Sequence, residues 1–260
     1  MQNSPTAIFL GSGTSTGVPL IGCDCAVCAS RDPRDSRLRS GLWVRHGDYS
    51  LLIDTATDFR QQALRERIPR VDAVLMTHFH ADHIFGLDDI RRFNTVQKER
   101  IPVYASPECM TVLTRIFDYF QNAATSGAYL PQIDFTPVTG PFPLGPFFIT
   151  PLPVIHGADP TWGYKIALGA HELAYIPDCA EIPEPTRAAL AGIPILILDA
   201  LRPRPHRSHF TIEQSIAAIQ SMGAKRGYLT HIGHDLLHTD IEKLCPKHIA
   251  PAYDGLEIAF

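Results

Sequence analysis

Residues 76–86, MTHFHADHIFG, place three histidines and one aspartate within six consecutive positions. An apolar run at 73–76 precedes them, and this pattern predicts a buried strand that ends in a polar loop. Side chains at alternate positions of an extended chain point to the same side, so His78 and His80 can reach one divalent ion. The stretch therefore predicts a metal site at the end of a strand.

Other residues of the ligand type extend this site. Asp82 and His83 are expected to face a second point, where a second ion would lie, as the chain turns into a helix. His156 closes the apolar stretch FFITPLPVIH, Asp178 closes LAYIPD and His231 closes GYLTH. The repeated placement at strand ends predicts a binuclear site, in which the carboxylate of Asp178 can bridge both ions.

Two further residues are expected to support the chemistry. Asp54 closes LLID and is suited to accept a hydrogen bond from a ligand imidazole. His209 stands just before Thr211, which forms a capping box with Gln214, so its imidazole is expected near a helix N-terminus. We predict that His209 donates a proton to a leaving alkoxide, with a purely supporting role as the alternative, and Asp82 is the other residue assigned a catalytic role. The basic residues of the same segment are candidates for phosphate binding or for the surface: Arg202, Arg204, His206 and Arg207.

The loop at 22–29 contains Cys23, Cys25 and Cys28. Three thiolates within six residues lack only a fourth ligand for a tetrahedral structural zinc. We choose His234 in the stretch THIGH, three residues after His231, so this zinc would tie the N-terminal loop to the floor of the active site. The alternative is a set of reduced cysteines without a metal.

Composition limits the possible classes of protein. The chain has 260 residues, of which 45% are hydrophobic, and we expect one domain over 1–260. The net charge is −4 and the basic residues are spread along the chain, so a long nucleic acid is not an expected partner. No stretch resembles a signal peptide or a membrane span, which predicts a cytoplasmic protein without a membrane partner.

Alternation and capping signals predict the secondary structure. Strands are expected at 7–10, 41–44, 50–53, 73–76, 103–105, 147–155, 163–168, 173–176, 195–198, 227–230 and 256–258. Helices are expected at 57–67, 84–93, 106–120 and 211–222. Strand-rich halves with interspersed helices favour two packed sheets with helices outside.

The pattern THFHADH, followed in order by His156, Asp178 and His231, resembles the metallo-β-lactamase-fold hydrolases. The resemblance implies an α/β (more strictly α+β) fold, a four-layer αββα sandwich with a binuclear site at one edge of the two sheets. It also implies the ligand sets: His78, His80 and His156 for one ion, Asp82, His83 and His231 for the other, and Asp178 as the bridge.

Further motifs resemble one branch of this superfamily, typified by the phosphoribosyl 1,2-cyclic phosphodiesterase of the carbon–phosphorus lyase pathway. They are the loop GSGTSTGVP at 11–19, the C-x-C-x-x-C segment, THIGH and the closing YDGLEIAF. The resemblance implies hydrolysis of a small cyclic phosphodiester of a phosphorylated sugar or nucleotide, two active-site ions (zinc or manganese) and one structural zinc. The family residue that matches His209 is implicated in catalysis, although the family's Asn-His-Cys-Asp is Ser-His-Phe-Thr here.

Three other functions remain open at this point. An RNA phosphodiesterase like tRNase Z shares the chemistry, but the chain lacks a basic arm for tRNA. A thioester hydrolase like glyoxalase II shares the metal ligands but carries an added helical domain. A non-enzymatic accessory like the coenzyme PQQ biosynthesis protein B is disfavoured by the complete ligand set. A homodimer through an exposed apolar edge strand is a further expectation.

Overall fold

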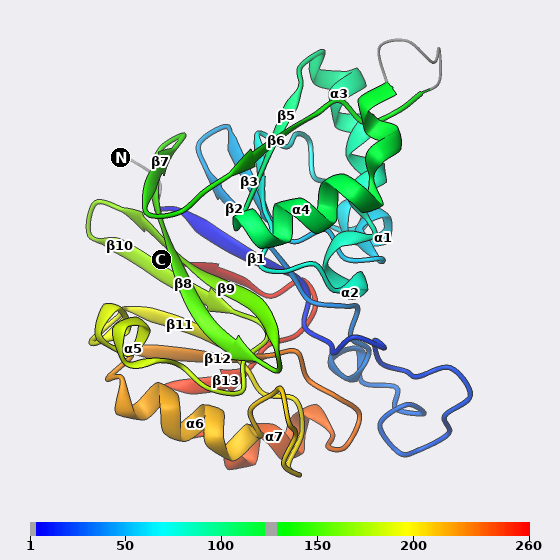
Figure 1. Cartoon of the computed structure of the whole chain (residues 1–260). Coiled ribbons are helices and arrows are strands. Elements are labelled where there is room, and N and C mark those ends of the chain that lie inside the picture. The colour runs from blue at the N-terminus through cyan, green and yellow to red at the C-terminus, as the bar shows by residue number, and fades with distance from the viewer. Residues whose placement is uncertain (1–3, 123–128) are drawn as a thin grey trace.

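In the computed structural model, which describes residues 4–122 and 129–260, two mixed seven-stranded sheets pack against each other (Figure 1). The first sheet has the order β14-β1-β2-β3-β4-β5-β6 and the second has the order β13-β12-β11-β10-β9-β8-β7. The first sheet contains β1 (Thr6–Gly11), β2 (Gly41–His46), β3 (Tyr49–Ile53), β4 (Ala73–Leu75), β5 (Ile101–Ala105), β6 (Ile133–Pro137) and β14 (Glu257–Ala259). The second contains β7 (Phe142–Leu144), β8 (Phe147–His156), β9 (Asp159–Leu168), β10 (His171–Ile176), β11 (Ile195–Asp199), β12 (Arg226–Thr230) and β13 (Ile249–Pro251).

Helices cover the outer face of each sheet (Figure 1). The first sheet carries α1 (Phe59–Arg65), α2 (Ala81–Ile84), α3 (Arg91–Gln97), α4 (Pro107–Ile116) and the 3₁₀ turns η2 (Leu87–Ile90) and η3 (Asp118–Asn122). The second carries α5 (Glu184–Leu190), α6 (Ile212–Ser221) and α7 (His238–Leu244), and η1 (Pro33–Asp35) lies in the N-terminal loop. This arrangement confirms the predicted αββα sandwich.

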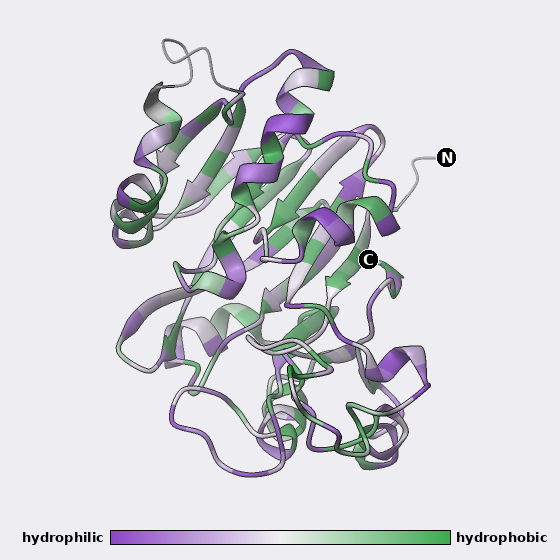
Figure 2. Ribbon diagram, turned by 90° about the vertical axis from the view of Figure 1, so that its right-hand side faces the viewer, coloured by the Kyte–Doolittle hydropathy of each residue, from purple (hydrophilic) through white to green (hydrophobic). Residues whose placement is uncertain are grey.

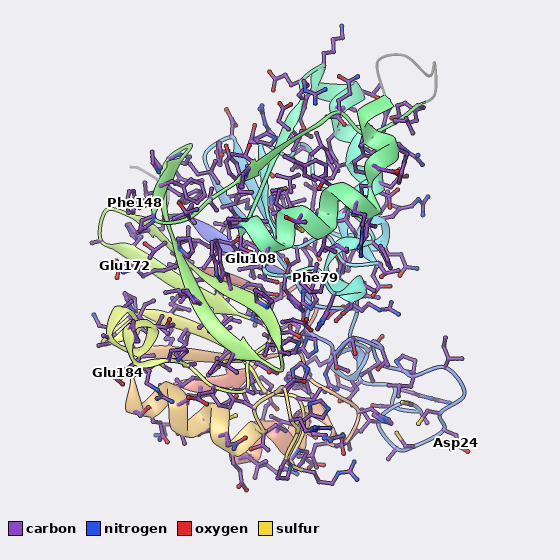
Figure 3. The ribbon with its side chains drawn as sticks, viewed as in Figure 1. Asp24, Phe79, Glu108, Phe148, Glu172 and Glu184 are labelled. Carbon is purple, nitrogen blue, oxygen red and sulfur yellow. The ribbon has the colours of Figure 1, made fainter. Side chains whose placement is uncertain are left out.

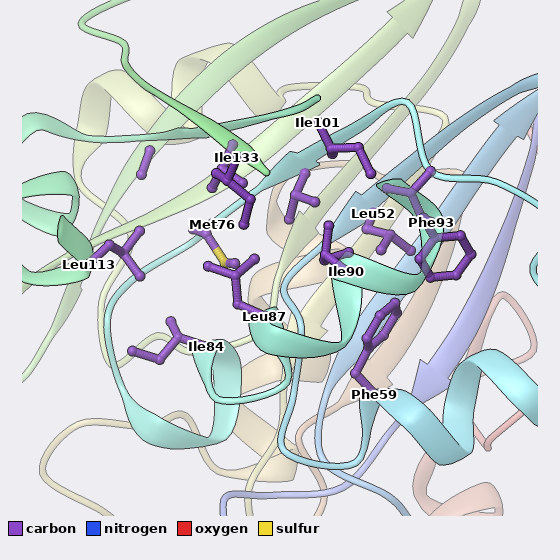
Figure 4. Close-up of a cluster of buried hydrophobic side chains, with 14 of the residues drawn as sticks. Leu52, Phe59, Met76, Ile84, Leu87, Ile90, Phe93, Ile101, Leu113 and Ile133 are labelled. Atoms are coloured by element: carbon purple, nitrogen blue, oxygen red, sulfur yellow. The ribbon is translucent and has the colours of Figure 1, made fainter. Parts of the chain in front are cut away.

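Side chains that alternate along the strands form three apolar layers. One lies between the two sheets, and the other two lie beneath the helices on the outer face of each sheet. In β3, Leu51 and Ile53 pack between the two sheets, whereas Leu52 packs under the helices of the first sheet. Figure 4 shows this outer layer, in which Phe59 and Phe93 lie beside Leu52. Because both faces of the inner strands are covered, most of their residues are apolar, and Figure 2 shows green over much of these strands.

The structure corrects the prediction of one helix over 84–93. The chain forms α2, the turn η2 and α3 instead, and Gly86 separates the first two. The Gly86 amide donates to the carbonyl oxygen of Thr55 at 2.9 Å. A Cβ atom at Gly86 would lie 2.1 Å from the carbonyl oxygen of Ala56, so this close approach requires glycine.

Two further differences concern the ends of elements. The helix expected over 106–120 ends at Ile116 and continues as η3. Three strands were not expected from the sequence, β6, β7 and β13, and each lies at the edge of its sheet. These segments, IDFTP, FPL and IAP, all contain proline, which cannot donate to a strand ladder and therefore weakens the strand pattern.

The capping signals are confirmed where they were expected. Ser106 accepts a hydrogen bond from the Cys109 amide, and Thr211 and Gln214 form the capping box of α6. In the described part of the chain, no helix has the length and apolar character needed to cross a membrane.

Candidate metal centre

The seven predicted ligands meet at one edge of the two sheets. His78 and His80 follow β4, while Asp82 and His83 lie on the short helix α2. The others follow three strands of the second sheet: His156 ends β8, Asp178 follows β10 and His231 follows β12. Their ligand atoms form overlapping groups that include His78–His80–His156, His78–His83–Asp178 and Asp82–His83–His231, within each of which the atoms lie no more than 4.8 Å apart.

The carboxylate of Asp178 lies between the two groups of histidines. Its Oδ1 is 3.1 Å from His83 Nε2 and 3.3 Å from His231 Nδ1. Its Oδ2 is 3.6 Å from His156 Nε2 and 4.0 Å from His78 Nε2. Each carboxylate oxygen therefore faces a different group, which is the arrangement that a bridging ligand needs.

Two outer contacts orient ligand rings. His83 Nδ1 donates to Asp54 Oδ2 at 2.8 Å, as the sequence predicts for Asp54. His156 Nδ1 donates to the carbonyl oxygen of Ser208 at 2.7 Å. Because an acceptor holds one ring nitrogen of each histidine as N–H, the other nitrogen presents a lone pair to the centre.

The two histidines after β4 are held in the same way. The Thr77 hydroxyl donates to Asp54 at 2.9 Å, which leaves its oxygen to accept from His78 Nδ1 at 3.0 Å. His80 Nε2 lies 3.0 Å from Asp159 Oδ2. The inner nitrogens of His78 and His80 are consequently only 2.9 Å apart.

The inner atoms fit divalent ions. His83 Nε2, His231 Nε2 and Asp178 Oδ1 are buried, and none has a hydrogen bond within the described residues. Burial opposes ionisation of Asp178, and positive charge on the imidazoles of His231 and His83 holds its pKa well below the ordinary value; divalent ions that replace those ring protons would supply the same positive charge. An ionised carboxylate among converging imidazole lone pairs is a donor set that zinc or manganese can accept.

Two of these residues have unusual backbone conformations. Asp54 has φ of 64° and His231 has φ of 58°, in the left-handed region that residues other than glycine rarely adopt. Asp54 directly follows β3 and His231 directly follows β12. Each residue therefore turns the chain where an inner strand of its sheet ends. Such strain is typical of functional sites.

His209 faces the same centre. Its Nε2 lies 4.0 Å from Asp178 Oδ2, and its Nδ1 lies 2.8 Å from Asp199 Oδ2. Burial disfavours the charged imidazole, but the hydrogen bond to Asp199 and the nearby carboxylates outweigh it and raise the pKa of His209. Burial raises the pKa of Asp199 to about 7.

The sequence reasoning missed Asp199. A signal was present, because Asp199 closes the apolar stretch ILILD as Asp54 closes LLID. Asp199 also accepts a hydrogen bond from the Cys179 amide at 2.9 Å, so its carboxylate is held from two sides. The carboxylate of Asp199 is placed to hold a proton on Nδ1 of His209, or to share that proton with the ring.

The second predicted group also assembles. Sγ of Cys23, Cys25 and Cys28 lies 3.5, 3.3 and 3.5 Å from His234 Nδ1. A tetrahedral zinc with bonds of about 2.3 Å to sulfur and about 2.0 Å to nitrogen separates sulfur from nitrogen by about 3.5 Å. The four residues therefore fit a closed zinc site. Figure 3 shows the loop that contains the three cysteines, with Asp24 labelled at its outer part.

Comparisons of sequence place the chain among known proteins. A family model for the beta-lactamase superfamily domain matches residues 49–232. An octanoyltransferase from Porphyromonas gingivalis is 38% identical over 254 residues, which are 96% of this chain but only 50% of that protein. A coenzyme PQQ synthesis protein B from Methylorubrum populi is 30% identical over 221 residues, 74% of this chain and 71% of that protein.

Solved structures agree with the fold. The crystal structure of a new diphosphatase from the PhnP family has a TM-score of 0.91 and 42% identity, and covers 100% of this chain and 98% of that chain. The short form of human tRNase Z, at a TM-score of 0.73 and 17% identity over 98% of both chains, shares the fold. The chain belongs to the beta-lactamase superfamily and is a metal-dependent hydrolase related to a diphosphatase of the PhnP family.

Proposed function

We propose that the protein hydrolyses small cyclic phosphodiesters, such as 5-phosphoribosyl 1,2-cyclic phosphate, to phosphomonoesters. The observation that carries this proposal is the imidazole of His209, whose Nε2 lies 4.0 Å from the central carboxylate of Asp178 and whose Nδ1 is held by Asp199. Breaking a phosphate ester of a sugar requires a proton for the departing oxygen. The relative with 42% identity is a diphosphatase, which supports chemistry at phosphorus.

Two divalent ions, zinc or manganese, would be held by His78, His80, His156, Asp82, His83, His231 and the bridging Asp178. Such ions lower the pKa of water and neutralise charge on phosphoryl oxygens. A third ion, a structural zinc, would be held by Cys23, Cys25, Cys28 and His234.

The protein's own groups complete the reaction. The oxygen of water forms a bond to phosphorus and releases one proton to solvent, and the ring P–O bond breaks with its electron pair on the sugar oxygen. His209 Nε2 gives that oxygen a proton, while Asp199 stabilises the imidazolium from the opposite nitrogen. Such proton transfer contributes about 10²- to 10⁴-fold to a rate.

A second candidate is hydrolysis of a diphosphate, in which the broken bond joins phosphorus to a bridging oxygen between two phosphoryl groups. The diphosphatase relative favours it. The same residues serve this reaction, but the departing oxygen then belongs to a phosphate, which needs less help from an acid.

A substrate screen tests the proposal. The metal-loaded protein is assayed on 5-phosphoribosyl 1,2-cyclic phosphate, 2′,3′-cyclic nucleotides, inorganic diphosphate, unstructured RNA and S-lactoylglutathione, with metal content measured on the same sample. We expect strong preference for a cyclic phosphodiester, and loss of activity and metal in Asp178→Asn. Preference for diphosphate selects the second candidate, and activity on the thioester alone contradicts both.

A further inference from the structure

A groove of 370 Å³ lies among the helices on the outer face of the first sheet, between α1 and α3. We name it the α1–α3 groove. Its floor is formed by Phe59, Ile68 and Phe93, each at most 8% exposed. The ring centroids of Phe59 and Phe93 lie 6.2 Å apart, and Figure 4 shows the two rings side by side. None of the seven predicted metal ligands lines the groove, so it is a site apart from the metal centre.

The walls of the groove include two exposed apolar side chains. Leu64 lies near the end of α1 and is 62% exposed, and Val96 lies near the end of α3 and is 55% exposed. A single exposed apolar residue is common on any protein, but here two of them flank an apolar floor. Concave, mainly apolar spaces of about 300–1,000 Å³ are typical of sites for small molecules. The groove therefore has the room and the surface for a short apolar chain.

Two arginines add positive charge to this apolar space. Arg60 on α1 and Arg92 on α3 both line the groove, and neither forms a salt bridge with any residue that the structure describes. By contrast, Arg65 and Arg91 lie on the same two helices, and each pairs with an aspartate. A guanidinium group binds the oxygens of a carboxylate or a phosphate through two parallel hydrogen bonds. The two arginines of the groove are therefore suited to the head group of an anion.

Asp89 is the one acidic residue among those that line the groove. It lies in η2, where burial and the neighbouring carboxylate of Asp88 raise its pKa more than Arg91 and Arg60 lower it. Even when Asp89 is ionised, one carboxylate stands against two guanidinium groups. An anion that enters the groove therefore meets a net positive charge.

The reaction at the metal centre uses none of these residues. We propose that the α1–α3 groove binds a small amphiphilic anion, whose apolar chain lies over the aromatic floor and whose carboxylate or phosphate head group lies against Arg60 and Arg92. A purely apolar surface of another protein would also cover the floor, but it would take water from both guanidinium groups without pairing them, which is unfavourable. The inference does not depend on the proposed function.

A series of ligands of increasing length tests the apolar part of the groove. The metal-loaded protein is titrated in a calorimeter with hexanoate, octanoate and decanoate, and with the three alkyl phosphates of the same chain lengths. Each added methylene that enters the groove is expected to tighten binding by about fourfold. Leu64→Asn should reduce this gain per methylene, because it removes an apolar wall. If neither series binds, or if the affinity does not change with chain length, the proposal is overturned.

Variants at the two arginines test the charged part of the groove. Arg60→Gln and Arg92→Gln are each expected to weaken binding of the anion by about five- to tenfold. Arg115→Gln is the matched control, because Arg115 is exposed on α4 and does not line the groove. The uncharged 1-octanol should bind the native protein and both arginine variants equally, and the series that binds more tightly identifies the head group. Unchanged affinity for both anions in the two arginine variants, or an equal loss in the control, overturns the proposal.

Discussion

At the scale of residues, the centre depends on pairs in which one side chain orients another. His83 is held by Asp54, and His209 is held by Asp199, at 2.8 Å in both pairs. In each pair, an aspartate at the end of a strand fixes the N–H of an imidazole. The opposite nitrogen of each ring is thereby aimed at the centre, so changes at the aspartates should act through the histidines.

The His209→Gln variant should retain its metal. Its loss of activity should depend on how much the leaving group of the substrate needs a proton. We expect about 10²- to 10⁴-fold loss on a sugar cyclic phosphate and a much smaller loss on bis(p-nitrophenyl) phosphate, because nitrophenolate departs without a proton. Steady-state kinetics with metal analysis checks this. Equal losses on the two esters would contradict an acid role. His171→Gln, at an exposed position of β10, is the control.

Asp199→Asn should slow hydrolysis of the sugar substrate by about 10²- to 10⁴-fold and alter the pH profile. The carboxylate raises the pKa of His209, so the protonated acid persists to higher pH in the native protein. Without that carboxylate the pKa falls, and the alkaline limb of the kcat/KM profile is expected to move to lower pH. A limb that stays in place or moves upward would show that Asp199 does not act through His209.

At the scale of elements, ligands are positioned by the ends of strands and by short turns between them. The amide of Thr55 donates to the carbonyl oxygen of His83, and that of Gly86 donates to Thr55. This contact ties α2 to the end of β3. The position of Asp82 and His83 therefore depends on backbone packing as well as on their own side chains.

Gly86→Ala should disturb this contact. The added Cβ would lie 2.1 Å from Ala56 O and 2.5 Å from Phe59 Cβ, and such overpacking is expected to lower the free energy of unfolding by about 1–3 kcal/mol. Urea denaturation and metal affinity are the measurements. Gly140→Ala has no atom within 4 Å of the new Cβ and should leave both unchanged. Equal stability of the two variants would be evidence against the crowding argument.

The cysteine loop at 22–29 should lose its zinc when one of the four zinc ligands is removed. Cys25→Ser is expected to contain one zinc fewer per chain and to melt at a lower temperature, because the loop is then joined to His234 less firmly. Metal analysis and calorimetry on the same sample check both. Cys245→Ser, outside the group, is the control. Unchanged zinc content in Cys25→Ser would refute the structural zinc site.

At the scale of the whole molecule, the metal centre joins the two sheets. His78 and His83 come from the end of the first sheet, while His156, Asp178 and His231 come from the second. A shared apolar layer already holds the sheets together. Metal binding should add to that stability, because the ligands are not assembled in the unfolded chain. The single domain over 1–260 and the homodimer remain predictions. Light scattering tests whether the protein forms the homodimer.

Removal of metal should therefore destabilise the whole protein. A ligand present at a thousand times its Kd stabilises by about 4 kcal/mol, which corresponds to a fall in Tm of about 10 °C on chelation for a chain of this size. Calorimetry before and after dialysis against a chelator, followed by zinc addition, measures the effect. A melting curve that is insensitive to chelation and readdition would contradict the role of metal between the sheets.

The sequence by itself determined the ligand types, their order and their places at strand ends, because local alternation, capping and residue chemistry are written in short stretches such as 76–86. It also predicted the two-sheet fold and the pairing of the cysteine loop with His234. The tertiary structure alone decided which atoms converge, since that depends on strand order and on packing between residues far apart in the chain. It revealed Asp199 behind His209 and the break at Gly86, both of which arise from contacts across the fold.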